Sequence, residues 1–434
     1  MMARIREMLR VSRTPMYANA NALVANQIQS AGFGFLYWVL AARLYPAAVV
    51  GTGFAVVSIL QLISGVAQLG FGGGMTRFLP RAGLQTRHII VVAYAAVSAM
   101  SVALALVFVA VGGALNLQGT FGSGPLVLAW AAIAAVLWSI FRLQDAVLIG
   151  LRESVWVLVE NTIFNVAKIV VLVLGVRLLG DAGVVGSWFV PTPIVIVLCT
   201  WLIFGVYTRS NRLKPAPEGT EPLTMREVAW SSGADHIGSL VAEGASRLLP
   251  LVIIGILGGP ATAYFTTAWL VATTLQLLAS GVTDSFTAEA AADRPNIARY
   301  SRETLRYMAI LIVPAALVLG FGAPVILVIA GKSYSQEGTV LLRWLCVASP
   351  LVVFNTWYLA YARVIGQIMR VVWLQVIAAA LLLGICIVTL DQLGISAVAV
   401  AWAISEGVIT LAGVVHSRHV LFGSGAAEGG AAAR

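Results

Sequence analysis

Charge is what this sequence has least of. Only 10% of its 434 residues are charged, against about 25% in an average soluble domain, and 60% are hydrophobic. So few charged side chains do not cover the surface of a soluble protein of this size. The composition therefore excludes a soluble enzyme and a nucleic-acid-binding domain, and we expect no catalytic residue, no cofactor and no nucleic-acid partner.

Cysteine and histidine are also scarce. The three cysteines lie within apolar stretches and the four histidines are scattered, so we expect neither a disulfide framework nor a metal site. Residues 331–333 (GKS) are the only partial match to a nucleotide-binding motif, and the first glycine of that motif is missing. The glycine-rich residues 70–74 are predicted to introduce a cytoplasmic turn, and they are not a phosphate-binding loop because no Lys-Ser/Thr pair follows them. A gradient, rather than ATP hydrolysis by this chain, would drive any transport.

Apolar residues, by contrast, occur in blocks of about 20, the length that crosses the roughly 30 Å hydrocarbon core of a bilayer. We interpret the block after the arginine-rich N-terminus as a retained helix rather than a cleaved signal peptide, because it contains several Asn and Gln residues. The sequence predicts an all-α integral membrane protein of about twelve transmembrane helices. These lie near residues 20–42, 47–69, 89–112, 125–148, 154–176, 184–207, 230–257, 261–286, 306–330, 340–362, 370–390 and 395–415.

The basic residues predict how the helices are oriented. With the N-terminus inside, cytoplasmic segments contain 20 Lys and Arg residues, whereas the opposite face contains only Arg43, Arg177 and Lys332. Lys and Arg collect on the cytoplasmic side of membrane proteins. We therefore expect both termini in the cytoplasm of a multi-pass protein of the bacterial inner (plasma) membrane.

The longest polar connection divides the chain into two halves of six spans. We predict an N-terminal lobe at 1–207, a cytoplasmic inter-lobe loop at 208–228, a C-terminal lobe at 229–415 and a cytoplasmic tail at 416–434. A faint repeat supports this division: residues 60–66 (LQLISGV) resemble residues 275–282 (LQLLASGV), about 215 positions later. Repeats of this kind are typical of transporters whose two pseudo-symmetric halves enclose the transport path.

Ionisable residues inside spans are the main functional signal, since each costs about 2.5–3.5 kcal/mol at the bilayer centre. In the seventh span, Asp235, Ser239, Glu243 and Arg247 recur every four residues and form a stripe on one helical face. One interpretation is a Glu243–Arg247 pair that only joins helices. The other is a cavity wall with a protonatable acid and an anion-binding arginine.

Polar residues in other spans extend this set. In the fifth span, Asn161, Asn165 and Lys168 share a face, and a lysine near mid-membrane needs a partner or water. In the first span, Asn26 and Gln29 either line the cavity or form interhelical hydrogen bonds. Glu406 stands alone in the twelfth span and is a predicted proton carrier. With Glu243 and Asp235 it makes up the predicted ion-coupling set.

Several segments resemble the polysaccharide and O-antigen (Wzx-type) flippases of the multidrug/oligosaccharidyl-lipid/polysaccharide (MOP) exporter superfamily. The resemblance covers essentially the whole chain, and twelve spans in two six-helix lobes match that family. The segments are residues 41–46 (AARLYP), 65–71 (GVAQLGF), 76–80 (TRFLP), 259–265 (GPATAYF) and 331–334 (GKSY).

The resemblance implies transfer of a polyprenyl-(pyro)phosphate-linked oligosaccharide from the inner to the outer leaflet by alternating access, for cell-surface polysaccharide or lipopolysaccharide biosynthesis. Membrane lipids and the polymerase or ligase proteins of that pathway are the implied partners, with a proton or another cation as coupling ion. The implied phosphate-binding residues are Lys168 and Arg247, with Arg77 and Arg81 at the cytoplasmic mouth. One feature departs from the family: the spans contain four basic and six acidic residues, which is not a strongly cationic lumen.

Two other functions compete with this one. The acid excess favours a cation-coupled exporter of small molecules or drugs from the same superfamily, with Glu243, Asp235 and Glu406 as coupling residues. A membrane-embedded glycosyltransferase, ligase or polymerase normally has a large external loop. The longest external connection predicted here, residues 113–124, has only about a dozen residues, which argues against an enzyme.

Overall fold

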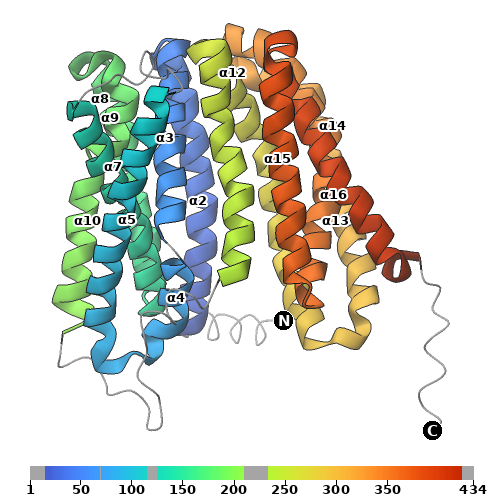
Figure 1. The fold of residues 1–434 in the computed structure, drawn as a ribbon, viewed down its shortest axis with the longest axis horizontal. Helices are drawn as coiled ribbons and strands as arrows, with labels where there is room; N and C mark the ends of the chain where they lie inside the picture. The colour runs from blue at the N-terminus through green and yellow to red at the C-terminus, as the bar shows by residue number, and fades with distance from the viewer. Residues whose placement is uncertain (1–14, 69, 115–124, 210–232, 423–434) are drawn as a thin grey trace, which may run out of the picture. The chain divides into compact units, whose positions relative to one another are not determined.

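The computed structural model describes residues 15–68, 70–114, 125–209 and 233–422, and nearly all of these residues are helical. The chain divides into two compact units, Met1–His236 and Ile237–Arg434. In each unit, long helices run alongside one another (Figure 1). The predicted inter-lobe loop at 208–228 lies almost wholly outside the described residues, so the domain bounds given above stay predictions.

Unit 1 contains long helices joined by short helical turns. Its α-helices are α2 (Pro15–Leu44), α3 (Ala47–Ala67), α4 (Phe71–Phe78), α5 (Thr86–Ala114), α7 (Pro125–Gly150), α8 (Ser154–Leu178), α9 (Gly183–Phe189) and α10 (Thr192–Trp201). The connecting turns are η1 (Leu79–Arg81), η2 (Gly83–Gln85) and η3 (Gly180–Ala182), and η4 (Leu202–Tyr207) is a π-helical end.

Unit 2 consists of α12 (Gly233–Ala292), η5 (Arg294–Asn296), α13 (Ile297–Val328), α14 (Lys332–Val364), α15 (Ile368–Leu393) and α16 (Ser396–Phe422). Helix α12 is two helices joined at Gly258, whose φ of 84° lies in the left-handed region that favours glycine. Pro260 follows and lacks the N–H that a continuous helix would use. This break coincides with the gap predicted between the seventh and eighth spans. Helices α13 and α14, and likewise α15 and α16, form hairpins.

Ten helices among the described residues are long and apolar enough to cross a membrane. One of them contains the two helices of α12, and α2, with 30 residues, is long enough but rich in Asn and Gln. Counting both additions gives the twelve predicted spans, so the predicted fold class is confirmed. The sixth span differs from the prediction because Pro191 and Pro193 divide it into α9 and α10. The orientation of the termini stays a prediction.

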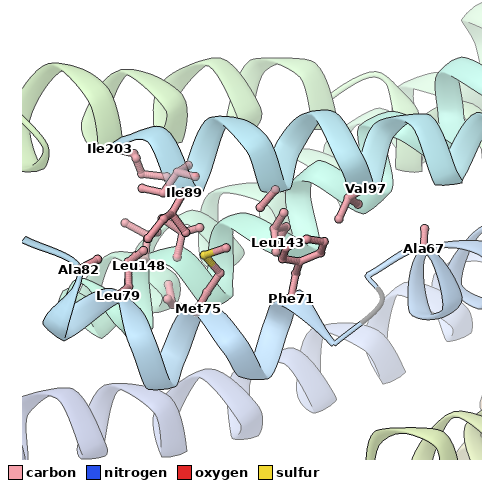
Figure 2. Packing of buried hydrophobic residues seen from close by; sticks show 14 residues of the cluster. Ala67, Phe71, Met75, Leu79, Ala82, Ile89, Val97, Leu143, Leu148 and Ile203 are labelled. Carbon is pink, nitrogen blue, oxygen red and sulfur yellow. The ribbon is translucent and has the colours of Figure 1, made fainter. Parts of the chain in front are cut away.

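The core of unit 1 shows why the glycines at 70–74 do not simply form a turn. Only Gly70 has a left-handed φ, of 82°, and the next residues form helix α4. Its apolar face, with Phe71 and Met75, packs against α5 and α7 (Figure 2). The backbones of α4 and α7 approach so closely that a Cβ at Gly150 would lie 2.5 Å from the carbonyl oxygen of Met75. The turn prediction was therefore wrong, because tertiary packing stabilises a helix despite its weak intrinsic propensity.

Candidate functional site

A polar cavity of about 370 Å³ lies inside unit 2, between helices α12, α14, α15 and α16. It contains two of the three predicted ion-coupling residues, Glu243 and Glu406, which come from the first and the last helix of the unit. Among the described residues that line it, none is Lys or Arg. The other polar side chains in its wall are Ser246, Gln276, Ser280, Asn355, Thr356, Gln375 and Ser405.

Glu406 is held in place by an asparagine from the neighbouring helix α14. The side-chain nitrogen of Asn355 donates to the backbone oxygen of Glu406 at 2.8 Å and to its carboxylate Oε2 at 2.7 Å. The Oδ1 atom of Asn355 accepts from the hydroxyl of Thr410 at 3.0 Å. These partners fix which side-chain atom of Asn355 is the nitrogen, because a carbonyl oxygen needs a donor. One buried amide thus positions the carboxylate of Glu406 and joins α14 to α16.

Gln375 on α15 also lines this cavity and has one buried acceptor without a partner among the described residues. Its side chain is only 8% exposed, and its Oε1 atom forms no hydrogen bond with any described residue. A buried polar atom without a partner costs about 1–3 kcal/mol.

Glu243 lies at the cavity wall beside Arg247, one helical turn further along α12. Their Oε1 and Nη2 atoms are 3.5 Å apart, and the side chains are 40% and 36% exposed. An exposed pair with i, i+4 spacing contributes only about 0.3–0.5 kcal/mol to stability. Glu243 therefore has a weakly held partner and reaches the cavity. Asp235 and Ser239 also lie on α12, but their side chains are outside the described residues.

Lys168 occupies a different environment, inside unit 1. It is 3% exposed, and its ammonium group donates to Oδ1 of Asn165 at 3.1 Å. The Nζ atom also lies 4.8, 5.2 and 4.3 Å from the ring centroids of Tyr37, Phe164 and Trp188. Three aromatic faces from α2, α8 and α9 thus enclose this cation, and cation–π attraction of about 2 kcal/mol is typical of such desolvated sites.

The remaining polar residues of the fifth span connect helices of unit 1. Asn161 donates to Oδ1 of Asp145 at 3.1 Å, which links α8 to α7. The thiol of Cys199 on α10 donates to Oε2 of Glu160, a residue that is 1% exposed. The other carboxylate oxygen of Glu160, Oε1, forms no hydrogen bond with any described residue. A buried acid is therefore present in unit 1 as well, close to Asp145.

Gln29 forms interhelical hydrogen bonds, one of the two roles expected for it and Asn26, whereas Asn26 bonds to Gln29 within α2. Gln29 donates to the backbone oxygen of Leu158 at 3.2 Å and accepts from the hydroxyl of Thr162 at 2.7 Å. It also donates to Oδ1 of Asn26 at 3.3 Å. These contacts join α2 to α8, and their proposed role toward a substrate stays a prediction.

Arg77 and Arg81 are exposed at the end of α4 and in η1. The guanidinium carbon of Arg77 lies 5.3 Å from the ring centroid of Phe78, and its charge remains accessible. The structure thus brings Glu243 and Glu406 to one cavity, whereas Lys168, Arg77 and Arg81 lie in the other unit. Asn355 and Gln375 were missed by the sequence analysis. Their signal was a neutral amide in the middle of an apolar span.

No family model matches the sequence, and no curated protein matches it. Solved structures do. An inward-facing multidrug resistance MATE family transporter of the MOP superfamily aligns with a TM-score of 0.68 over 90% of this chain and 94% of that one, at 15% identity. An outward-facing structure of such a transporter aligns with a TM-score of 0.59 over 94% and 96%, at 16% identity.

A third structure, a MOP superfamily transporter from Pyrococcus furiosus described as having a binding pocket of reverse polarity, has a TM-score of 0.58 and 16% identity. It covers 93% of both chains. At identities this low, the structural alignments establish the fold alone, and they do so over nearly the full length of each chain. This protein therefore has the fold of the MATE transporters of the MOP superfamily.

Proposed function

We propose that this protein is a secondary transporter that works by alternating access and exports small organic cations in exchange for protons or another cation. The observation that carries the proposal is the cavity of unit 2, with two carboxylates, several amides and no basic side chain among its described lining residues. Acidic residues within membrane helices mark ion pathways and proton relays. The negative potential of Glu243 and Glu406 would attract a cation.

The size of the cavity suits such a substrate. Its volume of about 370 Å³ falls in the range of about 300–1,000 Å³ that is typical of small-molecule sites. A proton and an organic cation compete for the same carboxylates, because each neutralises the charge that binds the other. Exchange would follow from this competition, since protonation of Glu406 or Glu243 releases the bound cation. This function is a transport function, and no bond of the substrate changes.

A lipid-linked oligosaccharide flippase is the second candidate. It is favoured by the Wzx-like segments of the sequence and by the exposed Arg77 and Arg81, which suit a phosphate. Its substrate would be a polyprenyl-linked glycan of the bacterial cell membrane, handled together with polymerase or ligase proteins. Lys168 is enclosed by aromatic rings and would need a rearrangement to reach a pyrophosphate. That requirement makes the flippase the weaker candidate.

Transport by proteoliposomes tests the first proposal. We expect wild-type protein to move a fluorescent organic cation such as ethidium when a pH gradient is imposed. Glu406→Gln and Glu243→Gln should each abolish the dependence on the gradient, because an amide takes up no proton in this pH range. Glu303→Gln is the matched control, because Glu303 is exposed on α13 and does not line the cavity.

Unchanged gradient-driven transport in both cavity variants would contradict the proposal. A second measurement separates the two candidates: the lipid-linked glycans of a strain depleted of the protein, with the leaflet of any accumulated species probed. Accumulation of one complete oligosaccharide-lipid on the cytoplasmic leaflet, together with no ethidium transport, would favour the flippase. An unchanged lipid-linked pool would favour the exporter.

A further inference from the structure

A second cavity opens on the outside of unit 2, between helices α13 and α14. It has a volume of about 540 Å³, and apolar side chains form most of its wall. Leu317 and Phe321 on α13 are 54% and 81% exposed, and Val347 on α14 is 67% exposed. In a membrane helix such an exposed apolar face contacts lipid. This groove is therefore part of the lipid-facing surface of the hairpin α13–α14.

Two polar groups interrupt the apolar wall. The exposed Arg343 lies at one end of the groove, and its Nε donates across the hairpin to the backbone oxygen of Gly320 at 3.3 Å. A snorkelling arginine would extend toward water, whereas this bond holds the guanidinium against α13. Further along the groove, Ser349 is 4% exposed, and its hydroxyl forms no hydrogen bond with any described residue.

Arg343 lies three residues inside one end of the predicted span 340–362. It lies eleven residues into α14, about 16 Å along the helix axis, and near the edge of the predicted span 340–362. From there the groove continues for seven residues to Pro350, which is about 10 Å along the helix. A cation near the end of a predicted span, followed by an apolar groove that runs toward the middle of the span, complements the shape and polarity of an anionic lipid.

We propose that the groove between α13 and α14 binds one anionic phospholipid of the surrounding membrane. Its phosphate contacts the guanidinium of Arg343, whose planar fork suits phosphate oxygens. Its chain lies along Leu317, Val347 and Pro350, and the hydroxyl of Ser349 donates to an ester oxygen. Basic pockets between membrane helices recognise anionic headgroups in this way. The proposal is independent of the transported substrate, because none of these residues lines the polar cavity.

Native mass spectrometry of the purified full-length protein tests the proposal, with phosphatidylglycerol and phosphatidylcholine as probes. Both probes contain a phosphate, but only phosphatidylcholine adds a cationic group that Arg343 repels. We expect the wild type to retain one phosphatidylglycerol at least about tenfold more tightly than phosphatidylcholine, because the choline cation of the latter is repelled by the guanidinium. Arg343→Gln should abolish this preference.

Two further variants make the result specific. Leu317→Trp adds bulk to an exposed position in the groove and should weaken binding of both lipids. Arg306→Gln is the matched control for Arg343→Gln. Arg306 is an exposed arginine on α13 outside the groove, and its replacement should leave the preference unchanged. A monodisperse protein with wild-type thermal stability in phosphatidylcholine shows that each variant is folded.

Three outcomes would overturn the proposal. Equal retention of the two probes by the wild type would show that the groove does not select charge. An unchanged preference in Arg343→Gln would place the lipid elsewhere. Displacement of phosphatidylglycerol by a stoichiometric amount of a polyprenyl phosphate would assign the groove to an isoprenoid lipid instead of a bulk phospholipid.

Discussion

The hydrogen bonds of Asn355 give the sharpest test of how the cavity of unit 2 is built. Replacing Asn355 by leucine keeps the side-chain volume and removes three hydrogen bonds. Two of them run to Glu406, at 2.8 and 2.7 Å, and one comes from Thr410, at 3.0 Å. The asparagine is 2% exposed, so water does not easily replace these bonds.

The expected loss in the free energy of unfolding follows from these bonds. Interhelical hydrogen bonds in membrane proteins contribute about 0.6 kcal/mol on average and at most about 1.7 kcal/mol. Three bonds of this kind give about 2 kcal/mol. Thr410 keeps its other bond, to the backbone oxygen of Glu406 at 2.9 Å, so its hydroxyl is not left without a partner. Glu406 loses its contact with the amide, which makes this carboxylate the main contributor.

A double-mutant cycle measures that contribution directly. Reversible unfolding in mixed micelles would be followed for Asn355→Leu, for Glu406→Leu, which leaves no side-chain acceptor, and for the double variant. We expect a coupling energy of about 1 kcal/mol, since contacting residues show couplings of about 0.5–3 kcal/mol. Thr389→Val on α15 is the control, because its hydroxyl bonds only within its own helix. Additivity of the two single variants within about 0.3 kcal/mol would refute the reasoning.

Three further predictions concern packing, buried charge and pH. Gly150→Ala should lower the free energy of unfolding by about 1–3 kcal/mol, because the new methyl group would collide with the backbone of α4. Gly32→Ala, where nothing lies within 4 Å, is its control and should not destabilise the protein; equal effects would contradict the argument. Lys168→Met should leave thermal stability unchanged or raised, since apolar replacement of a buried charge is often neutral or stabilising; a marked loss would show that the charge itself holds α2, α8 and α9 together. The side-chain amide of Asn296, which donates to the carboxylate at 2.8 Å, lowers the pKa of Asp293 below its ordinary value. The contact therefore contributes above the ordinary carboxyl pKa of about 4 and is lost as pH falls through the lowered value. Hydrogen exchange of the turn should then be faster in Asp293→Asn than in the wild type at pH 7, with the difference closing in acid; a difference that persists in acid would contradict this.

The helical spans could be predicted from the sequence because the bilayer imposes a simple rule on it. A block of about 20 apolar residues has few alternatives to a membrane helix. The same rule fails where helices leave the membrane. Helix α13 begins at Ile297, nine residues before its predicted span, because its first turns are polar and carry no hydropathy signal. Short helix α4 was missed for a related reason: its stability comes from packing on α7, which local composition does not encode.

The site could be predicted only in part. Charge identifies Glu243 and Glu406 in apolar surroundings, but it does not indicate that they share a cavity. That arrangement depends on how α12 and α16 pack within unit 2. Asn355 escaped notice because a neutral amide is a weak signal. Lys168 was expected to need a partner or water, and the structure surrounds it with aromatic rings, which occur in any apolar span and so carry no signal.

The sequence repeat allows corresponding positions of the two units to be compared. It aligns Gln61 on α3 with Gln276 on α12, and both amides belong to polar positions inside their own unit. Gln276 lines the acidic cavity, and the Oε1 atom of Gln61 is buried without a hydrogen-bond partner among the described residues. The two units also hold different charged groups, although each contains an acid among its helices, the buried Glu160 in unit 1 and the half-buried Glu406 in unit 2. Unit 1 encloses the cation of Lys168 between aromatic rings, whereas unit 2 leaves two carboxylates facing an open volume. Lys168 is enclosed by side chains of its own unit, whereas Glu406 and Glu243 line an open cavity in which a cation has room to bind. We therefore place the proposed cation binding in unit 2, where the carboxylates line the wall of a cavity.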